Sequence, residues 1–172
     1  MRIAILGNSG SGKSTLARWL SGQAGVESLD LDTVAWEPGK IAVARCPEAA
    51  EAEVRQFCST RGSWVVEGCY ANLIGQSLAY APRLLFLNPG LETCVDHCRK
   101  RPWEPHKYRS KEEQDQYLEP LLTWVAGYYT RDGDMSLAAH EKCYSSYLGP
   151  KEMLSGVSAN EVERRVRAWG EM

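Results

Sequence analysis

The chain has 172 residues, 44% of them hydrophobic and 24% charged, which is typical of a globular protein with a single core. Its formal net charge of −2 argues against a strongly basic protein that binds nucleic acid or a membrane surface, although a local basic patch could still contact nucleic acid. No apolar run approaches the roughly 20 residues that cross a bilayer, and because the first motif begins at residue 7 we expect no leader before it. We therefore expect one domain over residues 1–172, located in the cytoplasm and without a membrane partner.

A phosphate-binding motif follows the first apolar run. Residues 7–14 read Gly-Asn-Ser-Gly-Ser-Gly-Lys-Ser and fit G-x-x-x-x-G-K-[ST], the P-loop. Residues 2–6 predict a buried strand before it, and the apolar spacing of residues 13–23 predicts a helix after it. Glycines let backbone N–H groups curl toward an anion, and the helix N-terminus adds partial positive charge. We expect ATP to contact Gly7, Asn8, Ser9, Gly10, Ser11, Gly12, Lys13, Ser14 and Thr15.

Two residues of this motif would act on the phosphates directly. Lys13 would reach the β- and γ-phosphates, and the Ser14 hydroxyl would ligate Mg²⁺. An ordinary Gly/Ser-rich turn is the alternative, but the strand before the motif and the helix after it favour the P-loop.

Acidic residues follow the second predicted strand, residues 26–30. Ligands of open α/β sheets bind beyond the carboxyl ends of the strands, so Asp30 and Asp32 should lie level with the P-loop. Their spacing of two puts both on one side if the strand persists that far. Such carboxylates can hold Mg²⁺ through water or accept a proton from a substrate hydroxyl, and a loop or helix-capping role is the alternative.

The third predicted strand, residues 63–66, ends in Glu67 and Gly68. A carboxylate directly after a buried strand beside a P-loop is the Walker B arrangement, in which Glu67 would support Mg²⁺ or position the attacking group. Gly68 would let the backbone approach a ligand closely. The alternative for Glu67 is a solvated residue at a strand end.

A basic segment follows the fourth predicted strand, residues 83–89. Residues 99–109 carry five basic side chains together with Trp103 and Tyr108, and two prolines exclude a regular helix there. Such a segment could close over the phosphates and neutralise the transferred group. The alternatives are a solvated basic loop or a surface that faces a peptide or nucleic acid. With the helix after it, this segment forms an expected lid and kinked-helix insertion over residues 99–130.

Helical patterns dominate the rest of the chain. Helices are predicted over residues 47–61, 91–101, 110–129, 135–147 and from 158 onward. The helix over 110–129 begins with a capping box at Ser110 and should kink at Pro120, whose missing N–H leaves the carbonyl of Gln116 without a partner. A fifth strand has only a weak signal, for which residues 143–148 are the best candidate.

The six cysteines lack a C-x-x-C pair, and we expect free thiols. A zinc site could be drawn from Cys94, His97, Cys98 and His106. Cys94 and Cys98 fall on the apolar face of a predicted helix, where cysteine acts as a small hydrophobic residue, so we do not expect zinc.

Four landmarks stand in the order of a known group of proteins: Gly7 to Ser14, Asp30 to Asp32, Val65 to Gly68, and Leu85 to Pro89 followed by Arg101. This order resembles the nucleoside-monophosphate, shikimate and gluconate kinase group of P-loop proteins. Within that group the chain is most similar to small adenylate-kinase-related proteins called DNA topology modulation proteins. Those pair a Leu-Asp-x-Asp segment and a Trp with a strand that ends in Asp-Gly-x-Tyr, and the counterparts here are Leu29 to Asp32, Trp36, and Glu67 to Tyr70. The similarity covers residues 1–101.

The resemblance implies a three-layer α/β/α P-loop fold with a parallel sheet of about five strands and a helical lid and C-terminal region. It implies ATP and Mg²⁺ as cofactors and a small-molecule phosphoryl acceptor. The expected catalytic residues are Lys13, Asp32 and Arg101. The expected metal ligands are Ser14, Asp30 and Glu67. The expected acceptor contacts are Asp32, Trp36, Gly68 and Arg109.

The sequence departs from the group at several positions. Glu67 replaces an Asp, Asn88 stands where many members have Asp, and His97 stands where the lid helix often has an Arg four residues before Arg101. The Asp-Gly-Phe-Pro-Arg signature of adenylate kinases is absent, which argues against AMP as the acceptor. We therefore expect a kinase that transfers the γ-phosphate of ATP to an unidentified small molecule. The alternatives are an ATP-binding or ATP-hydrolysing switch with a protein or nucleic-acid partner, and a nucleotide-binding scaffold without turnover. The sequence carries no signal for an oligomeric state.

Overall fold

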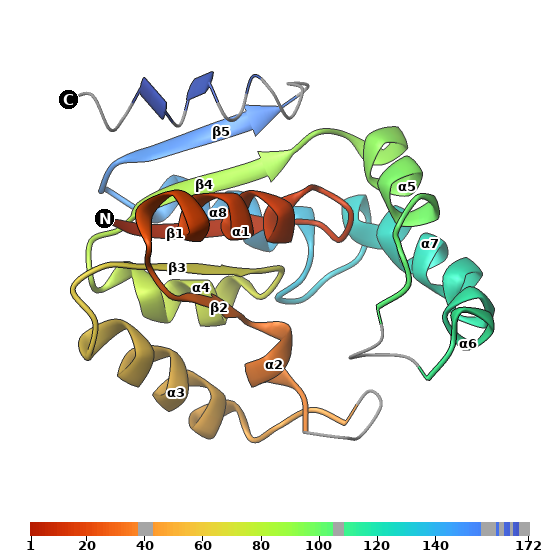
Figure 1. Ribbon diagram of the computed structural model, residues 1–172, viewed down its shortest axis with the longest axis horizontal. Helices are drawn as coiled ribbons and strands as arrows, with labels where there is room; N and C mark the ends of the chain where they lie inside the picture. Colours follow the sequence, from red (N-terminus) through yellow and green to blue (C-terminus); the bar gives the residue numbers. More distant parts are fainter. Residues whose placement is uncertain (38–42, 105–108, 156–160, 162–163, 166, 169–172) are drawn as a thin grey trace.

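A five-stranded parallel sheet organises the protein. The computed structural model describes residues 1–37, 43–104, 109–155, 161, 164–165 and 167–168 (Figure 1). The strands are β1 (Arg2–Gly7), β2 (Ser28–Asp30), β3 (Trp64–Gly68), β4 (Arg83–Asn88) and β5 (Lys151–Ser155), and they lie in the order β2-β3-β1-β4-β5. All neighbouring strands are parallel, so their carboxyl ends meet at one edge of the sheet.

Helices cover both faces of the sheet. They are α1 (Lys13–Ala24), α2 (Asp32–Ala35), α3 (Pro47–Ser59), α4 (Ala71–Leu78), α5 (Leu91–Arg99), α6 (Lys111–Gln116), α7 (Leu118–Ala126), the 3₁₀ helix η1 (Gly127–Tyr129) and α8 (Leu137–Ser146). In Figure 1, α1 lies in front of the sheet, and α4 and α8 lie behind it. The predicted three-layer α/β/α fold is therefore confirmed.

The two sides of the core follow the strand period of two. Along β1, Ile3 and Ile5 pack with the apolar face of α1, whereas Ala4 and Leu6 pack with residues of α3 and α4. Both faces of this central strand are buried, as its continuous apolar run predicts.

Helices α5, α6 and α7 lie beyond the carboxyl ends of the strands (Figure 1). Their common core is a small separate cluster that contains the buried residues Cys94, Cys98, Leu122 and Val125. This cluster closes one side of the edge of the sheet at which the P-loop lies.

The prediction of the fifth strand was wrong. Residues 143–146 are the last turn of α8, and β5 lies at Lys151–Ser155. Strand β5 pairs with β4 alone, and only Leu154 of its five residues is buried. An edge strand with one buried residue lacks the apolar run that marks a central strand, which is why the pattern did not show it.

Helix α4 was also absent from the prediction. It has eight residues with Gly75 inside it, and its N-cap residue, Tyr70, makes no side-chain capping hydrogen bond. The cap comes instead from Asp134, whose Oδ1 accepts a hydrogen bond from the backbone N–H of Asn72 over 2.7 Å. A cap supplied from 62 residues away leaves no local signal.

The predicted helix over 110–129 is two helices, α6 and α7, that are separated at Tyr117 and followed by η1. The break falls one residue after Gln116, whose carbonyl cannot accept the helical hydrogen bond from residue 120 because Pro120 lacks an N–H. The predicted cap at Ser110 is confirmed, since its Oγ accepts from the Glu113 N–H over 3.2 Å. The helix expected from residue 158 begins outside the described residues. Within the described ranges, no helix is both long and apolar enough to cross a membrane.

Candidate functional site

The loop between β1 and α1 has the geometry of a phosphate cradle. Gly10 and Gly12 have φ of 76° and 94°, in the left-handed region that glycine enters without a steric penalty. Lys13 opens α1, and its buried ammonium group donates to the Asn8 carbonyl over 2.8 Å, across the loop. The predicted sequence of strand, glycine-rich loop and helix is confirmed.

Two helices hold this loop from outside. The side-chain amide of Asn8 donates to the Val125 carbonyl of α7 over 3.0 Å, and Nδ1 of His97 on α5 lies 2.8 Å from the Gly10 carbonyl. A Cβ on Gly10 would stand 2.2 Å from the Cys94 carbonyl oxygen. Gly10 is therefore required both by its backbone conformation and by the close approach of α5.

The remaining loop residues line or adjoin the cradle. Gly7 ends β1, Ser9 follows Asn8 and donates its N–H to that side chain, and Ser14 and Thr15 are exposed in the first turn of α1. Within the described part of the chain, the Ser11 hydroxyl is one of two buried side-chain polar atoms that lack a hydrogen-bond partner. An unsatisfied buried hydroxyl inside the loop is available to an oxygen of a bound anion.

Glu67 is buried at the end of β3, where it is 4% exposed. It pairs in register with Ile5 of β1 and with Asp30 of β2, and the nearby Ser14 side chain lowers the pKa of its carboxyl group. Burial raises the pKa of Glu67, Lys13 opposes that rise, and Asp30 adds to it. A solvated strand-end residue is therefore ruled out, and Glu67 occupies the position expected of a Walker B carboxylate.

Asp30 and Asp32 lie at the same edge of the sheet as Glu67, but the local structure that brings them there differs from the predicted strand. Strand β2 stops at Asp30, and Asp32 opens α2, so the two residues do not share a strand face. Instead, the Asp30 carboxylate accepts from the Asp32 N–H over 2.9 Å and turns the chain. The charges of both carboxylates raise the pKa of Glu67, so all three acidic groups act on one another at this edge of the sheet.

A chain of three side chains positions Asp32. Trp36 Nε1 donates to the Tyr70 hydroxyl over 2.7 Å, and that hydroxyl donates to Asp32 Oδ1 over 2.8 Å. Burial, with the charge of Asp32 as a further cause, raises the pKa of Tyr70 far above its ordinary value, so the hydroxyl keeps its proton. Trp36 also forms an antiparallel bridge with Ala44. Tyr70 was not among the predicted site residues. The sequence feature that could have indicated it is its position at the end of the Glu67-to-Tyr70 segment, which directly follows a buried strand.

The donor set fits Mg²⁺ better than zinc. The described residues contain no group of three His, Cys, Asp or Glu side chains that would hold a metal ion by themselves. Mg²⁺ usually takes one or two carboxylates together with phosphate oxygens and water, and the Ser14 hydroxyl beside Glu67, with Asp30 nearby, supplies such a partial set. The thiols of Cys94 and Cys98 are buried and free, and burial raises the pKa of both, which opposes the thiolate that zinc requires.

Gly68 is explained by packing. A Cβ on Gly68 would stand 2.7 Å from the Cβ of Leu31, which directly precedes α2. Only glycine therefore allows the end of β3 to lie against this residue. A contact between Gly68 and an acceptor stays a prediction.

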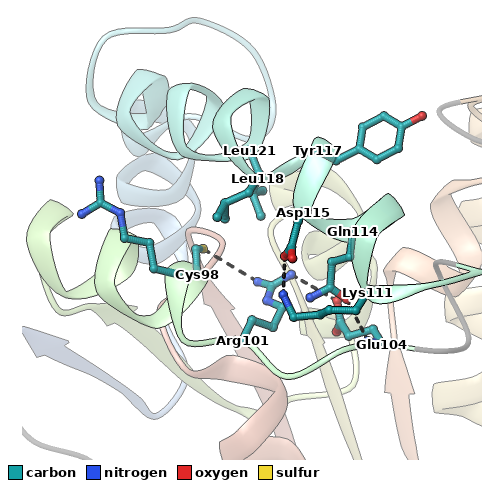
Figure 2. Close-up of a pocket in the computed structure, with 10 residues that line it drawn as sticks. Cys98, Arg101, Glu104, Lys111, Gln114, Asp115, Tyr117, Leu118 and Leu121 are labelled. Carbon is teal, nitrogen blue, oxygen red and sulfur yellow. Dashed lines mark hydrogen bonds and ion pairs between the residues drawn. The ribbon is translucent and has the colours of Figure 1, made fainter.

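Arg101 and Arg109 have no described contact with the P-loop. Arg101 points toward Glu104 and Cys98, with its guanidinium 3.4 Å from the Glu104 carboxylate, beside a small cavity between α5, α6 and α7 (Figure 2). Cys98 in turn adjoins Gly10, since a Cβ on Gly10 would stand 2.9 Å from its Sγ. Arg109 is exposed, and its backbone N–H donates to Glu113. Of the basic segment, Lys107 lies outside the described residues.

No protein-family profile matches the sequence, and no curated protein matches it. Solved structures do match. A gluconokinase from Sinorhizobium meliloti 1021 is 15% identical, with a TM-score of 0.60 over 97% of this chain and 89% of its own. A sugar kinase from Janibacter sp. HTCC2649 is 14% identical, with a TM-score of 0.55 over 99% of this chain and 94% of its own.

A third match is a shikimate kinase from Bacteroides thetaiotaomicron, which is 15% identical, with a TM-score of 0.52 over 100% of this chain and 99% of its own. At these identities the likeness shows the fold, which is that of small-molecule P-loop kinases. The predicted resemblance to that group is supported in its fold, and none of these three structures supports the narrower resemblance to DNA topology modulation proteins.

Proposed function

We propose that the protein is an ATP- and Mg²⁺-dependent phosphotransferase that acts on a small hydroxyl-bearing acceptor. The observation that carries the proposal is the grouping of Asp32, fixed by the Tyr70 hydroxyl, with Glu67 and Lys13 at the edge of the sheet. A phosphate cradle with a positioned carboxylate beside it has the two halves that phosphoryl transfer needs.

The proposed reaction forms one bond and breaks one. The acceptor oxygen forms a bond to the γ-phosphorus, and the bond from that phosphorus to the β,γ-bridging oxygen breaks, so that the electron pair leaves with ADP. The acceptor proton passes to the Asp32 carboxylate and then to solvent. Lys13 and the loop N–H groups stabilise negative charge on the phosphates. When bound beside Ser14 and Glu67, Mg²⁺ supplies further charge neutralisation.

The acceptor would lie on the α2 side of the P-loop. Trp36 and Tyr70 offer aromatic surface there, and Asp32 offers a hydrogen-bond acceptor for a hydroxyl group. Because the solved structures with this fold include kinases named for gluconate, sugars and shikimate, polyols, sugars, sugar acids and cyclic hydroxy acids are the first acceptors to test.

Residues 99–130 are proposed as the lid over this site, with Arg101 as the residue that reaches the transferred phosphate. In the present arrangement Arg101 faces Glu104, so this role requires the arginine to exchange that carboxylate for a phosphate oxygen. Arg109 and Gly68 remain proposed acceptor contacts.

A binding switch with a nucleic-acid partner is less well supported. The proposed basic surface is partly neutralised by its own acids, since Lys100 pairs with Asp96 over 2.7 Å and Arg101 pairs with Glu104. Such pairs leave less positive charge for a phosphate backbone.

The test is ADP release from Mg·ATP in the presence of pooled acceptors, compared between wild type and Lys13→Ala. Losing a hydrogen bond from a charged group, worth about 1.5–3 kcal/mol, should weaken ATP binding about 10- to 100-fold and abolish acceptor-dependent turnover. Lys142→Ala, which removes an exposed lysine of α8 outside both the cradle and the proposed lid, is the matched control and should behave as wild type. ADP release that no acceptor class stimulates would count against a kinase and favour the switch.

A further inference from the structure

A fully buried histidine lies behind the acceptor side of the site. His140 of α8 is 0% exposed, with Nε2 2.8 Å from the Cys69 carbonyl oxygen and Nδ1 2.8 Å from the Tyr128 hydroxyl. A carbonyl only accepts, so Nε2 carries the proton, and Nδ1 of the neutral ring accepts from Tyr128. Burial lowers the pKa of His140 to about 4, which keeps the ring neutral at pH 7.

The carbonyl that His140 binds belongs to the segment that carries Tyr70. Strand β3 ends at Gly68, so Cys69 lies beyond the strand ladder, and its carbonyl takes this hydrogen bond from His140 instead. The next residue is Tyr70, whose hydroxyl donates to Asp32. The His140 hydrogen bond therefore acts one residue away from the group that positions the carboxylate.

The other partner of His140 leads to the phosphate side. Tyr128 lies in η1, directly after α7, and three residues before it the Val125 carbonyl accepts from the side chain of Asn8 in the P-loop. The end of α7 thus contacts the P-loop through Val125, and η1, which follows it, contacts His140 through Tyr128.

Packing leaves the imidazole little freedom. The ring of Phe86 meets the His140 ring nearly edge-on, with centroids 5.9 Å apart and planes at 81°. The Tyr128 ring lies 5.2 Å away on centroids. With both nitrogens bonded and two aromatic rings against it, the imidazole has one orientation, as a residue that transmits position requires.

We propose that His140 is a positioning residue, which with Tyr128 fixes the Cys69–Tyr70 backbone and so holds Asp32 in register with the P-loop. The expected effect of His140 on kcat rests on the proposed function. Its expected effect on the position of Tyr70 does not, because that position can be measured without turnover.

The positional test uses the indole N–H of Trp36, which donates to the Tyr70 oxygen. The chain has six tryptophans, and the Trp36 signal in a ¹H–¹⁵N spectrum is assigned by its loss in Trp36→Phe. In His140→Phe, which loses the donor to Cys69, this signal should shift. His140→Gln, which keeps an N–H donor, should restore it toward the wild-type position. Tyr128→Phe provides a milder variant if His140→Phe does not fold.

Tyr147→Phe is the matched control for this test. Tyr147 directly follows the same helix, and its hydroxyl donates to the carbonyl of Pro82, away from the Cys69–Tyr70 segment. The control should leave the Trp36 signal in place. A Trp36 signal that stays unmoved in folded His140→Phe and Tyr128→Phe would overturn the proposal.

The kinetic test compares kcat with the KM for ATP in the same variants. We expect kcat with an acceptor to fall at least tenfold in His140→Phe, with partial rescue in His140→Gln and a KM for ATP within about twofold of wild type. Unchanged kcat in folded His140→Phe, or an equal fall in Tyr147→Phe, would contradict a positioning role. If the Trp36 signal moves as expected while wild type phosphorylates no acceptor, the positional inference stands and the proposed kinase function fails.

Discussion

The hydroxyl of Tyr70 donates a hydrogen bond to Asp32 Oδ1 over 2.8 Å, and so joins the end of β3 to the first residue of α2. Neither element alone would fix this carboxylate, since α2 has four residues and begins without a side-chain cap. The same hydroxyl accepts from Trp36 over 2.7 Å, which fixes the direction of its own proton. In the proposed reaction, this arrangement holds the Asp32 carboxylate in place before the substrate that receives the phosphoryl group binds.

Tyr70→Phe should slow phosphoryl transfer while leaving ATP binding unchanged. The variant keeps the aromatic ring but removes the hydrogen bond to a charged group, which is worth about 1.5–3 kcal/mol, or about 10- to 100-fold in kcat. Steady-state kinetics of acceptor-dependent ADP release would measure the effect. The control is Tyr80→Phe, which removes another tyrosine hydroxyl, the one that donates to the Arg55 carbonyl. Equal losses in the two variants would show that the effect is on folding rather than on Asp32.

Gly10→Ala should destabilise the protein by more than the cost of placing alanine at a positive φ, because the added Cβ also clashes with a neighbouring helix. At Gly133, φ is also positive and nothing lies within 4 Å of an added Cβ, so Gly133→Ala reports the conformational cost, about 1–2 kcal/mol. Gly10→Ala adds a clash with the backbone of Cys94. We expect it to be more destabilising than Gly133→Ala in urea unfolding and to weaken ATP binding, which Gly133→Ala should not do. Similar unfolding midpoints for the two variants would refute the close contact with α5.

Glu67→Gln should stabilise the ligand-free protein and weaken Mg·ATP binding. Burial disfavours the charged form of Glu67 and raises its pKa, so a neutral amide of the same shape relieves that cost at pH 8. An unfolding midpoint higher by about 2–4 °C corresponds to roughly 1 kcal/mol in a chain of this size. Thermal unfolding with and without Mg·ATP would measure both effects, with Glu119→Gln as the exposed control. A lower midpoint without ligand would contradict this account of Glu67.

His140 should make the stability of the protein depend on pH in mildly acidic solution. Its pKa falls from 6.5 in the unfolded chain to about 4 in the folded protein, because burial disfavours the charged ring. Between these pH values the unfolded chain binds more protons than the folded protein. The free energy of unfolding therefore keeps its full contribution from His140 above pH 6.5 and loses it as the pH falls toward 4. The loss from this group is about 3 kcal/mol. Urea unfolding between pH 7 and 4 should show a shallower decline in His140→Gln. Equal slopes in the two proteins would mean that His140 titrates normally.

The sequence predicted those parts of the site that are contiguous in the chain. The cradle over residues 7–14 depends on neighbouring glycines and on the helix that directly follows, so its local pattern was sufficient. Glu67 was placed correctly because a buried apolar run ends one residue before it.

Other parts of the site depend on contacts between distant residues. Asp30 and Asp32 were predicted from a continued strand, yet a turn within their own segment brings them to the site. The hydroxyl of Tyr70 acts across 38 residues, and the imidazole of His140 acts across 71. A pattern of neighbouring residues cannot show which distant partner a side chain meets.

The fold was predicted where strands are buried on both faces and was missed where they are not. Strands β1, β3 and β4 carry continuous apolar runs, whereas β5 lies at the edge of the sheet and has the exposed residue Met153 at its centre. Helix α4 depends on a cap from Asp134, which the local sequence does not contain.

The most direct test of the central proposal is ³¹P NMR of the protein with Mg·ATP and pooled hydroxyl acceptors, compared with Asp32→Asn. In wild type we expect a new phosphomonoester signal that grows in step with ADP. In Asp32→Asn that signal should grow at least tenfold more slowly, although ATP still binds. Conversion of ATP to ADP and inorganic phosphate alone, at the same rate in both proteins, would contradict phosphoryl transfer to a small acceptor at Asp32.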